Sequence, residues 1–144
     1  MRVMGLDVGD RRIGVALSDS LGLTAQPLTV LERRHAAADT AAVQALIEAH
    51  GVETVVVGLP LTMAGAHGVQ ADKVTAFAGQ LRRGLSVPVQ FVDERLTTVQ
   101  GERALREAGI RGRRRKQVID RVAAQLILQQ FLDSQHRPPV EPVP

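Results

Sequence analysis

Residues 3–18 read VMGLDVGDRRIGVALS, and this stretch decides the fold. Residues 3–8 form an apolar run typical of a buried strand, and residues 13–18 form the returning strand of a predicted β-hairpin. One residue breaks the apolar pattern, because Asp7 places a carboxylate inside the first strand. A buried carboxylate is costly unless a cation or good hydrogen-bond donors compensate it. Asp7 is therefore either a functional acid or, as the alternative, a cap for the turn at Gly9.

The pattern outward from this hairpin alternates strands with helices. The expected elements are further strands at 24–31, 54–58 and 89–92, and helices at 36–49, 69–83, 97–109 and 117–133. Pro27 would place its strand at or near a sheet edge, because proline cannot donate a ladder hydrogen bond. Three antiparallel strands followed by parallel strands with crossover helices predict an α/β fold. Its core would be a mixed five-stranded sheet with helices on both faces.

The chain of 144 residues fits a single domain, expected over residues 1–133, followed by a Pro-rich tail at 134–144 that we expect to be disordered. It contains no cysteine, which excludes a disulfide scaffold, a thiolate zinc site and a cysteine nucleophile. No apolar stretch approaches the roughly 18 residues of a membrane span, and the N-terminal residues do not resemble a signal peptide. The sequence therefore predicts a cytoplasmic protein with no membrane partner.

The net charge is +3, and two short segments of the chain are densely basic. The residues of the dense run are Arg111, Arg113, Arg114, Arg115 and Lys116, and Arg11 and Arg12 form a smaller pair. Solvated surface is an equally good reading for the pair, whereas the longer run favours contact with phosphates. Trp and Tyr are absent and Phe occurs three times, so base stacking on aromatic side chains is not expected. A nucleic-acid partner would be gripped through its backbone and shape.

Further acids follow the strand at 89–92 and begin the last helix. Asp93 and Glu94 lie beyond a strand end, where open α/β sheets bind ligands, although taken alone they are better read as an ordinary polar loop. Asp120 begins an apolar ridge and is expected to face the sheet, or alternatively to stabilise the helix N-terminus through the dipole. Three convergent carboxylates would suit Mg²⁺ or Mn²⁺, and two such ions can support phosphodiester hydrolysis.

Four segments in order resemble the YqgF family, also called RuvX. They are GLDVGDRRIGVALSD (5–19), VVVGLPLTMAGAHG (55–68), FVDERLTT (91–98) and RRRKQVIDRVAAQLILQQFLD (113–133). The resemblance implies an RNase H-like fold whose acidic metal-binding and catalytic positions fall on Asp7, Glu94 and Asp120. It favours Glu94 over its neighbour Asp93, since adjacent residues on an extended chain point in opposite directions.

The resemblance also implies an activity, that of a two-metal-ion endonuclease. Its expected role is processing of the 5′ end of precursor 16S ribosomal RNA in ribosome biogenesis. The alternative is cleavage of Holliday junctions in recombination and repair, for which a homodimer would be suited because a junction needs two incisions. Flanking phosphates would be held by Arg11, Arg12, Arg95 and the cluster Arg113, Arg114, Arg115 and Lys116. The Gly-rich loop 59–68 could close over substrate.

Two other classes of protein remain open at this point. A non-catalytic nucleic-acid-binding or antitermination factor would use the basic run and need no metal, so metal titration separates it from a nuclease. A nucleotide-binding ATPase is suggested by GLDVG, which also resembles the phosphate loop of actin-like kinases. Those enzymes need a second lobe, which 144 residues do not supply.

Overall fold

The computed structural model describes residues 1–60, 68–93 and 112–136, and for residues 112–121 it describes the backbone alone. The strands are β1 (Val3–Val8), β2 (Arg12–Ser18), β3 (Ala25–Glu32), β4 (Thr54–Leu59) and β5 (Val89–Asp93). The helices are α1 (Ala36–His50), α2 (Val69–Gly84) and α4 (Gly112–His136). These elements confirm the predicted order within one or two residues, except at both ends of α4. The helix expected at 97–109 and the loop 61–67 lie outside the described residues.

The strands form one mixed sheet in the order β3-β2-β1-β4-β5. The hairpin partners β1 and β2 are antiparallel, as are β2 and β3, whereas β1, β4 and β5 run parallel to one another. The predicted mixed five-stranded α/β sheet is therefore confirmed, and Pro27 does lie on an edge strand. In this order β1, the strand that carries Asp7, is the central strand of the sheet.

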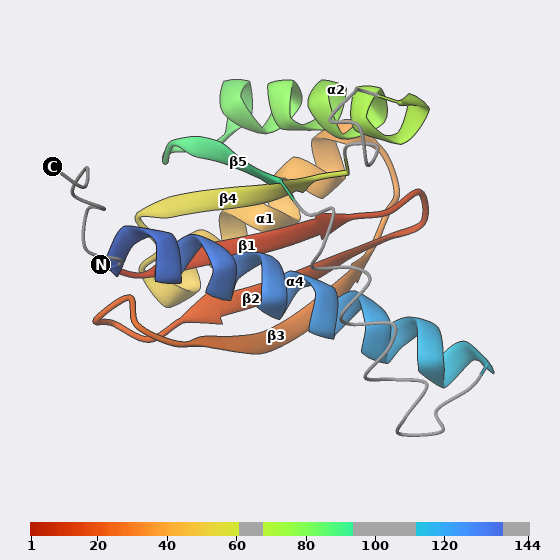
Figure 1. The fold of residues 1–144 in the computed structure, drawn as a ribbon. Coiled ribbons are helices and arrows are strands. Elements are labelled where there is room, and N and C mark those ends of the chain that lie inside the picture. Colours follow the sequence, from red (N-terminus) through yellow and green to blue (C-terminus); the bar gives the residue numbers. More distant parts are fainter. Residues whose placement is uncertain (61–67, 94–111, 137–144) are drawn as a thin grey trace, which may run out of the picture.

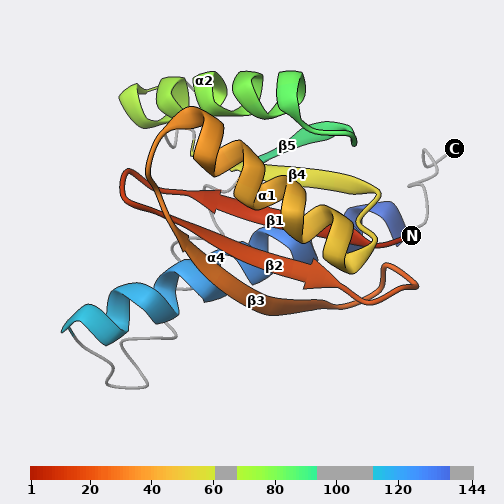
Figure 2. The same ribbon diagram turned by 180° about the vertical axis from the view of Figure 1, so that it is seen from behind.

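Among the described helices, one covers one face of the sheet and two cover the other. Figure 1 shows α4 crossing one face, and Figure 2, from behind, shows α1 and α2 on the other. Because side chains alternate along a strand, Met4, Leu6 and Val8 of β1 belong to the core beneath α1 and α2. Val3 belongs to the second core with residues of α4 such as Leu128. The chain thus forms three layers, with the sheet in the middle.

The helix α4 packs very closely on β1. A Cβ atom on Gly5 would lie 2.7 Å from Cβ of Leu128 and 3.1 Å from the Ala124 carbonyl oxygen, so only glycine allows this approach. At the end of the sheet where β1 begins, the Ala25 N–H donates to Gln129 Oε1 (2.9 Å), and the His136 ring bonds the Gly22 carbonyl (2.9 Å). The helix therefore runs antiparallel to β1, and its first turns extend past the sheet beyond the end of β1 (Figures 1 and 2).

The ends of α4 correct the sequence-based expectation. We expected the basic run to precede a helix starting near Gln117, but Arg113, Arg114, Arg115 and Lys116 lie inside its first turns. Arginine and lysine are good helix formers, which permits this extension. The helix also continues to His136, where Ser134 Oγ donates to the Phe131 carbonyl (2.7 Å), so the first three residues of the expected tail are helical. Residues 137–144 lie outside the described part. None of the described helices is long and apolar enough to cross a membrane.

Candidate functional site

The candidate site lies at the carboxyl edge of the sheet. The parallel strands β1, β4 and β5 end there at Val8, Leu59 and Asp93. Open α/β sheets bind ligands at this edge, because the loops that follow parallel strands converge there. The turn between β1 and β2 and the overhanging first turns of α4 border the same edge (Figure 1).

Asp7 lies at this edge on the central strand, paired with Gly14 of β2. It is half-buried and alternates with Leu6 and Val8, which places it on the α4 face of the sheet. The register between β1 and β4 ends at Leu6 and Val57, so Asp7 lies one residue past the last described pair. The turn is closed by the Gly9 N–H, which donates to the Arg12 carbonyl (2.9 Å), so capping by Asp7 is not needed to explain this turn.

Of the adjacent acids Asp93 and Glu94, the structure describes only Asp93. Asp93 ends β5 opposite Leu59, and it shares the strand face of Val89 and Phe91, which pack toward α1 and α2. Its carbonyl oxygen accepts a hydrogen bond from Gln130 Nε2 of α4 (3.0 Å). Glu94 lies outside the described residues. Asp93 and Asp7 therefore occupy strand positions of opposite faces.

Asp120 belongs to α4, four residues before Ala124, and its side chain lies outside the described part of the structure. Of the three predicted metal ligands Asp7, Glu94 and Asp120, the structure therefore describes the side chain of Asp7 alone. Among the side chains that are described, no group of three or more His, Asp or Glu residues is arranged to hold a metal ion.

Basic residues flank the edge on two sides. Arg11 is exposed and Arg12 is half-buried on the β1–β2 turn, and Lys73 of α2 reaches the same turn through an ion pair with Asp10 (3.3 Å). The four basic residues of the α4 start carry positive charge where the helix N-terminus is already positive, and no acidic residue lies in that first turn. Such an arrangement is electrostatically unfavourable unless an anion lies nearby. Arg95 and Arg111 lie outside the described residues.

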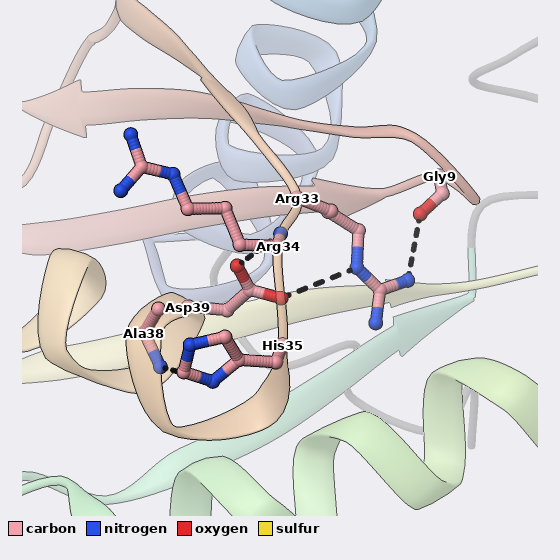
Figure 3. Close-up of polar contacts among 6 residues, drawn as sticks. All are labelled: Gly9, Arg33, Arg34, His35, Ala38 and Asp39. Carbon is pink, nitrogen blue, oxygen red and sulfur yellow. Dashed lines mark hydrogen bonds and ion pairs between the residues drawn. The ribbon is translucent and has the colours of Figure 1, made fainter.

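Sequence reasoning missed two residues beside this turn, Arg33 and Asp39. Figure 3 shows Arg33 reaching from the segment between β3 and α1 to the Gly9 carbonyl, with Asp39 alongside. The distance from Arg33 Nη1 to the Gly9 oxygen is 2.8 Å, and Arg33 Nε lies 3.6 Å from Asp39 Oδ2. An arginine pair just before an Ala-rich helix resembles solvated surface in the sequence, and only the fold reveals its partner.

Comparison with known proteins relates nearly the whole chain to one family. A family model described as "RuvX: Holliday junction resolvase" matches residues 1–134. A relative from Moorella thermoacetica is 58% identical over 133 residues, covering 92% of this chain and 95% of its own. A relative from Pelotomaculum thermopropionicum is 50% identical over 139 residues, covering 96% of this chain and 90% of its own. Both are named "Putative pre-16S rRNA nuclease".

Solved structures agree on the fold. RuvC of T. thermophilus in complex with a Holliday junction substrate matches with a TM-score of 0.58 at 19% identity, covering 94% of this chain and 95% of that one. The Fowlpox virus resolvase in complex with Holliday junction DNA matches with a TM-score of 0.59 at 10% identity, covering 95% and 100%. At these identities the likeness shows the fold alone, and that fold is RNase H-like, as the sequence predicted.

Proposed function

Because the chain belongs to the RuvX family and is a nuclease, we propose that it is a metal-dependent endonuclease that processes the 5′ end of precursor 16S ribosomal RNA. The observation that carries this proposal is the position of Asp7. It is a half-buried carboxylate on the central strand, at the edge where parallel strands end. A purely structural role on the face that α4 covers could be served by an apolar residue, as it is at Val3 on the same face of β1.

The proposed metal ligands are Asp7, Glu94 and Asp120. Carboxylate oxygens are the donors that Mg²⁺ and Mn²⁺ prefer, and the half-buried position of Asp7 fits such a ligand. Two bound divalent ions would supply Lewis-acid activation of water and stabilisation of the leaving oxygen. The protein would fix the carboxylates, and it would exclude part of the bulk water through the packing of α4 against β1.

The packing of α4 supports the choice of Asp120. From the contact between Gly5 and Ala124, Asp7 is two residues further along β1, about 7 Å. Asp120 is four residues back along the antiparallel helix, about 6 Å in the same direction. The two backbone positions should therefore lie at a similar level near the edge. The strand face of Asp93 weighs against Asp93 and favours Glu94.

Substrate phosphates would be held by the basic residues that border this edge. Arg11 and Arg12 lie on the turn that follows Asp7, and the α4 overhang brings Arg113, Arg114, Arg115 and Lys116 past the sheet. Arg95 would join them directly after Glu94. These contacts position a nucleic-acid backbone without reading its sequence, which suits recognition by shape. The expected place of action is the cytoplasm, where ribosomes are assembled.

A second candidate function is cleavage of Holliday junctions, which the description of the matching family favours. A junction requires two incisions, so this function would be performed best by a homodimer that presents two such edges. Both candidates use the same site and the same chemistry. They differ in the substrate that the basic overhang of α4 must accommodate.

One cleavage experiment decides between these functions. Purified protein is incubated with a precursor 16S rRNA leader, a four-way DNA junction and duplex DNA, each in Mg²⁺, Mn²⁺ or EDTA. We expect metal-dependent cleavage of the RNA leader. Cleavage of the junction alone would support the second candidate, and equal cleavage in EDTA would contradict the metal site. Binding of nucleic acid without cleavage in any condition would favour a non-catalytic factor.

The largest effect on this activity is expected from Asp7→Asn. The substitution removes the charge while keeping the shape, so kcat should fall at least about a hundredfold. The free energy of unfolding should stay within about 1 kcal/mol, because a half-buried charge is removed rather than a packing contact. Calorimetric titration should show weaker Mn²⁺ binding.

A matched control is Asp10→Asn, which removes an exposed acid three residues away on the same turn. This variant should keep wild-type kcat and Mn²⁺ binding. Full activity of Asp7→Asn would refute the assignment of the site. Equal losses in both variants would mean that the charge of the turn matters rather than a particular carboxylate.

A further inference from the structure

On the side of α1 and α2, Arg33 makes two hydrogen bonds to the β1–β2 turn. Arg33 Nη1 donates to the Gly9 carbonyl (2.8 Å), and the Arg33 backbone N–H donates to the Arg11 carbonyl (2.8 Å). The two bonds reach the turn at its beginning and near its end. The guanidinium also stacks over the ring of Phe77 of α2, 4.7 Å from its centroid. Arg33 thus connects the turn to the helical layer on the opposite face from α4.

Arg33 is itself oriented by a buried acid. Asp39, in the first turn of α1, is 5% exposed, and its Oδ2 lies 3.6 Å from Arg33 Nε. Its Oδ1 accepts the Arg34 backbone N–H (2.9 Å), so both carboxylate oxygens have partners (Figure 3). A paired, hydrogen-bonded carboxylate can be buried at this depth, and losing its partner would leave an uncompensated charge.

The position of Asp7 depends on the hairpin that Arg33 holds. The described pairing of β1 with β4 ends at Leu6, whereas Asp7 and Val8 stay paired with Gly14 and Ile13 of β2, and Gln70 Nε2 of α2 donates to the Val8 carbonyl (3.4 Å). Beyond Leu6, the strand pairing that the structure describes for β1 is with β2, the strand that continues from the turn. The Gly9 carbonyl that Arg33 binds is two residues after Asp7. A shift of the turn would move the carboxylate directly.

A similar contact elsewhere in the molecule provides a comparison. Arg82 of α2 donates to the Val89 carbonyl through Nη2 (3.0 Å) and Nε (3.3 Å), and it stacks over Phe91 at 5.0 Å. This contact has the same chemistry, because an arginine stacks on a phenylalanine ring and donates to a backbone carbonyl. It lies at the first residue of β5, at the opposite end of that strand from the candidate site.

We propose that Arg33 and Asp39 are positioning residues of the nuclease site, which fix the β1–β2 turn and thereby hold the Asp7 carboxylate in place. The inference rests on the proposed role of Asp7. Arg33 does not touch substrate in this assignment. It acts through Gly9, and Asp39 acts through Arg33. The pair therefore affects the rate of cleavage more than the binding of nucleic acid.

The test compares Arg33→Gln, Arg33→Lys and Asp39→Asn with the control Arg82→Gln. For each variant, kcat and KM are measured on the substrate that the wild type cleaves, at a temperature where thermal melting shows it folded. We expect kcat of Arg33→Gln to fall about ten- to a hundredfold with little change in KM, because small displacements of a catalytic group have effects of this size. Arg33→Lys should recover part of the loss, since lysine keeps the charge but cannot form the same fork.

A readout independent of activity is amide hydrogen exchange at Gly9, whose N–H bonds the Arg12 carbonyl. Exchange should be faster in Arg33→Gln and Asp39→Asn and unchanged in Arg82→Gln. If Arg33→Gln does not fold, Asp39→Asn carries the same comparison, because it keeps the shape of the side chain. Wild-type kcat in the Arg33 and Asp39 variants, or an equal loss in Arg82→Gln, would overturn the inference. A wild type that cleaves no substrate would instead overturn the proposed function.

Discussion

Leu6 and Asp7 are neighbours on β1 that face opposite layers of the molecule. Leu6 is fully buried beneath α1 and α2, in a core built from aliphatic and aromatic side chains. Asp7 is half-buried on the face that α4 covers, at the edge where the described β1–β4 pairing has ended. The same strand thus contributes to stability through one face and carries the proposed site on the other.

The two faces are also packed differently. On the α4 face the strand carries Gly5, which allows close approach, and α4 is fixed to the start of β3 by the amides of Gln125 and Gln129. These hydrogen bonds help to fix the position of α4 on the sheet, in addition to the apolar contacts that bury it. The α1/α2 face combines its apolar core with hydrogen bonds from α2 to strand carbonyls, from Arg82 to Val89 (3.0 Å) and from Gln70 to Val8 (3.4 Å). The site proposed between β1 and α4 lies on the face where Gly5 allows the close approach of a helix.

The largest stability effect in this comparison is expected from Leu6→Ala. Removing a fully buried leucine should lower the free energy of unfolding by about 2–5 kcal/mol through lost burial and a cavity. Folded molecules should keep most of the wild-type kcat, in contrast to Asp7→Asn. Urea denaturation and cleavage assays measure the two quantities. The control Leu21→Ala, at a side chain 71% exposed, should change neither. A large loss of kcat in folded Leu6→Ala would mean that the two faces are not separable.

A smaller effect, on both quantities, is expected from Gly5→Ala. The added Cβ atom would lie 2.7 Å from Leu128 Cβ, so α4 must move away from β1. We expect a loss of about 1–3 kcal/mol in the free energy of unfolding, the usual cost of overpacking. A reduced kcat should accompany it, because Asp120 lies on the helix that moves.

The control for this substitution is Gly79→Ala on α2, where a Cβ atom would meet only Arg83 Nη1, at 3.8 Å. It should be neutral or stabilise by up to about 1 kcal/mol, because alanine favours helix. Gly5→Ala with unchanged kcat would show that the exact position of α4 does not control the site.

The smallest effect is expected at Asp19, an acid that also follows a strand but has a structural explanation. Its Oδ1 accepts the N–H groups of Leu23 and Thr24 (2.7 and 3.1 Å), and these bonds lower the pKa of the Asp19 carboxyl below its ordinary value of 3.8. A lowered pKa in the folded state stabilises the fold above the unfolded-state pKa, and this contribution is lost as the pH falls through the folded-state pKa.

Asp19→Asn should therefore be slightly less stable than the wild type at pH 7, and the difference should disappear in acid below the lowered pKa. Thermal melting from pH 2 to pH 7 measures this. Its kcat should equal that of the wild type. A reduced kcat would mean that an acid with satisfied hydrogen bonds also serves the site, which would weaken the contrast with Asp7.

Local patterns in the sequence were sufficient for most of the fold. The apolar runs around Asp7 predicted β1 and β2, and Pro27 predicted the edge position of β3, because these features act within a few residues of chain. The ends of α4 were predicted poorly. Its start depends on charged residues that favour helix in isolation, and its end depends on the contact of His136 with Gly22, distant in sequence.

The sequence by itself determined the layered α/β fold, the family and the identity of the acids worth testing. An apolar strand interrupted by one carboxylate is visible without coordinates, and it is notable because burial makes that carboxylate costly. Only the tertiary structure decided the opposite strand faces of Asp7 and Asp93, the close packing of α4 on Gly5 and the contact of Arg33 with the Gly9 carbonyl. Each of these depends on residues far apart in the chain meeting at short range, and no local pattern encodes such a meeting.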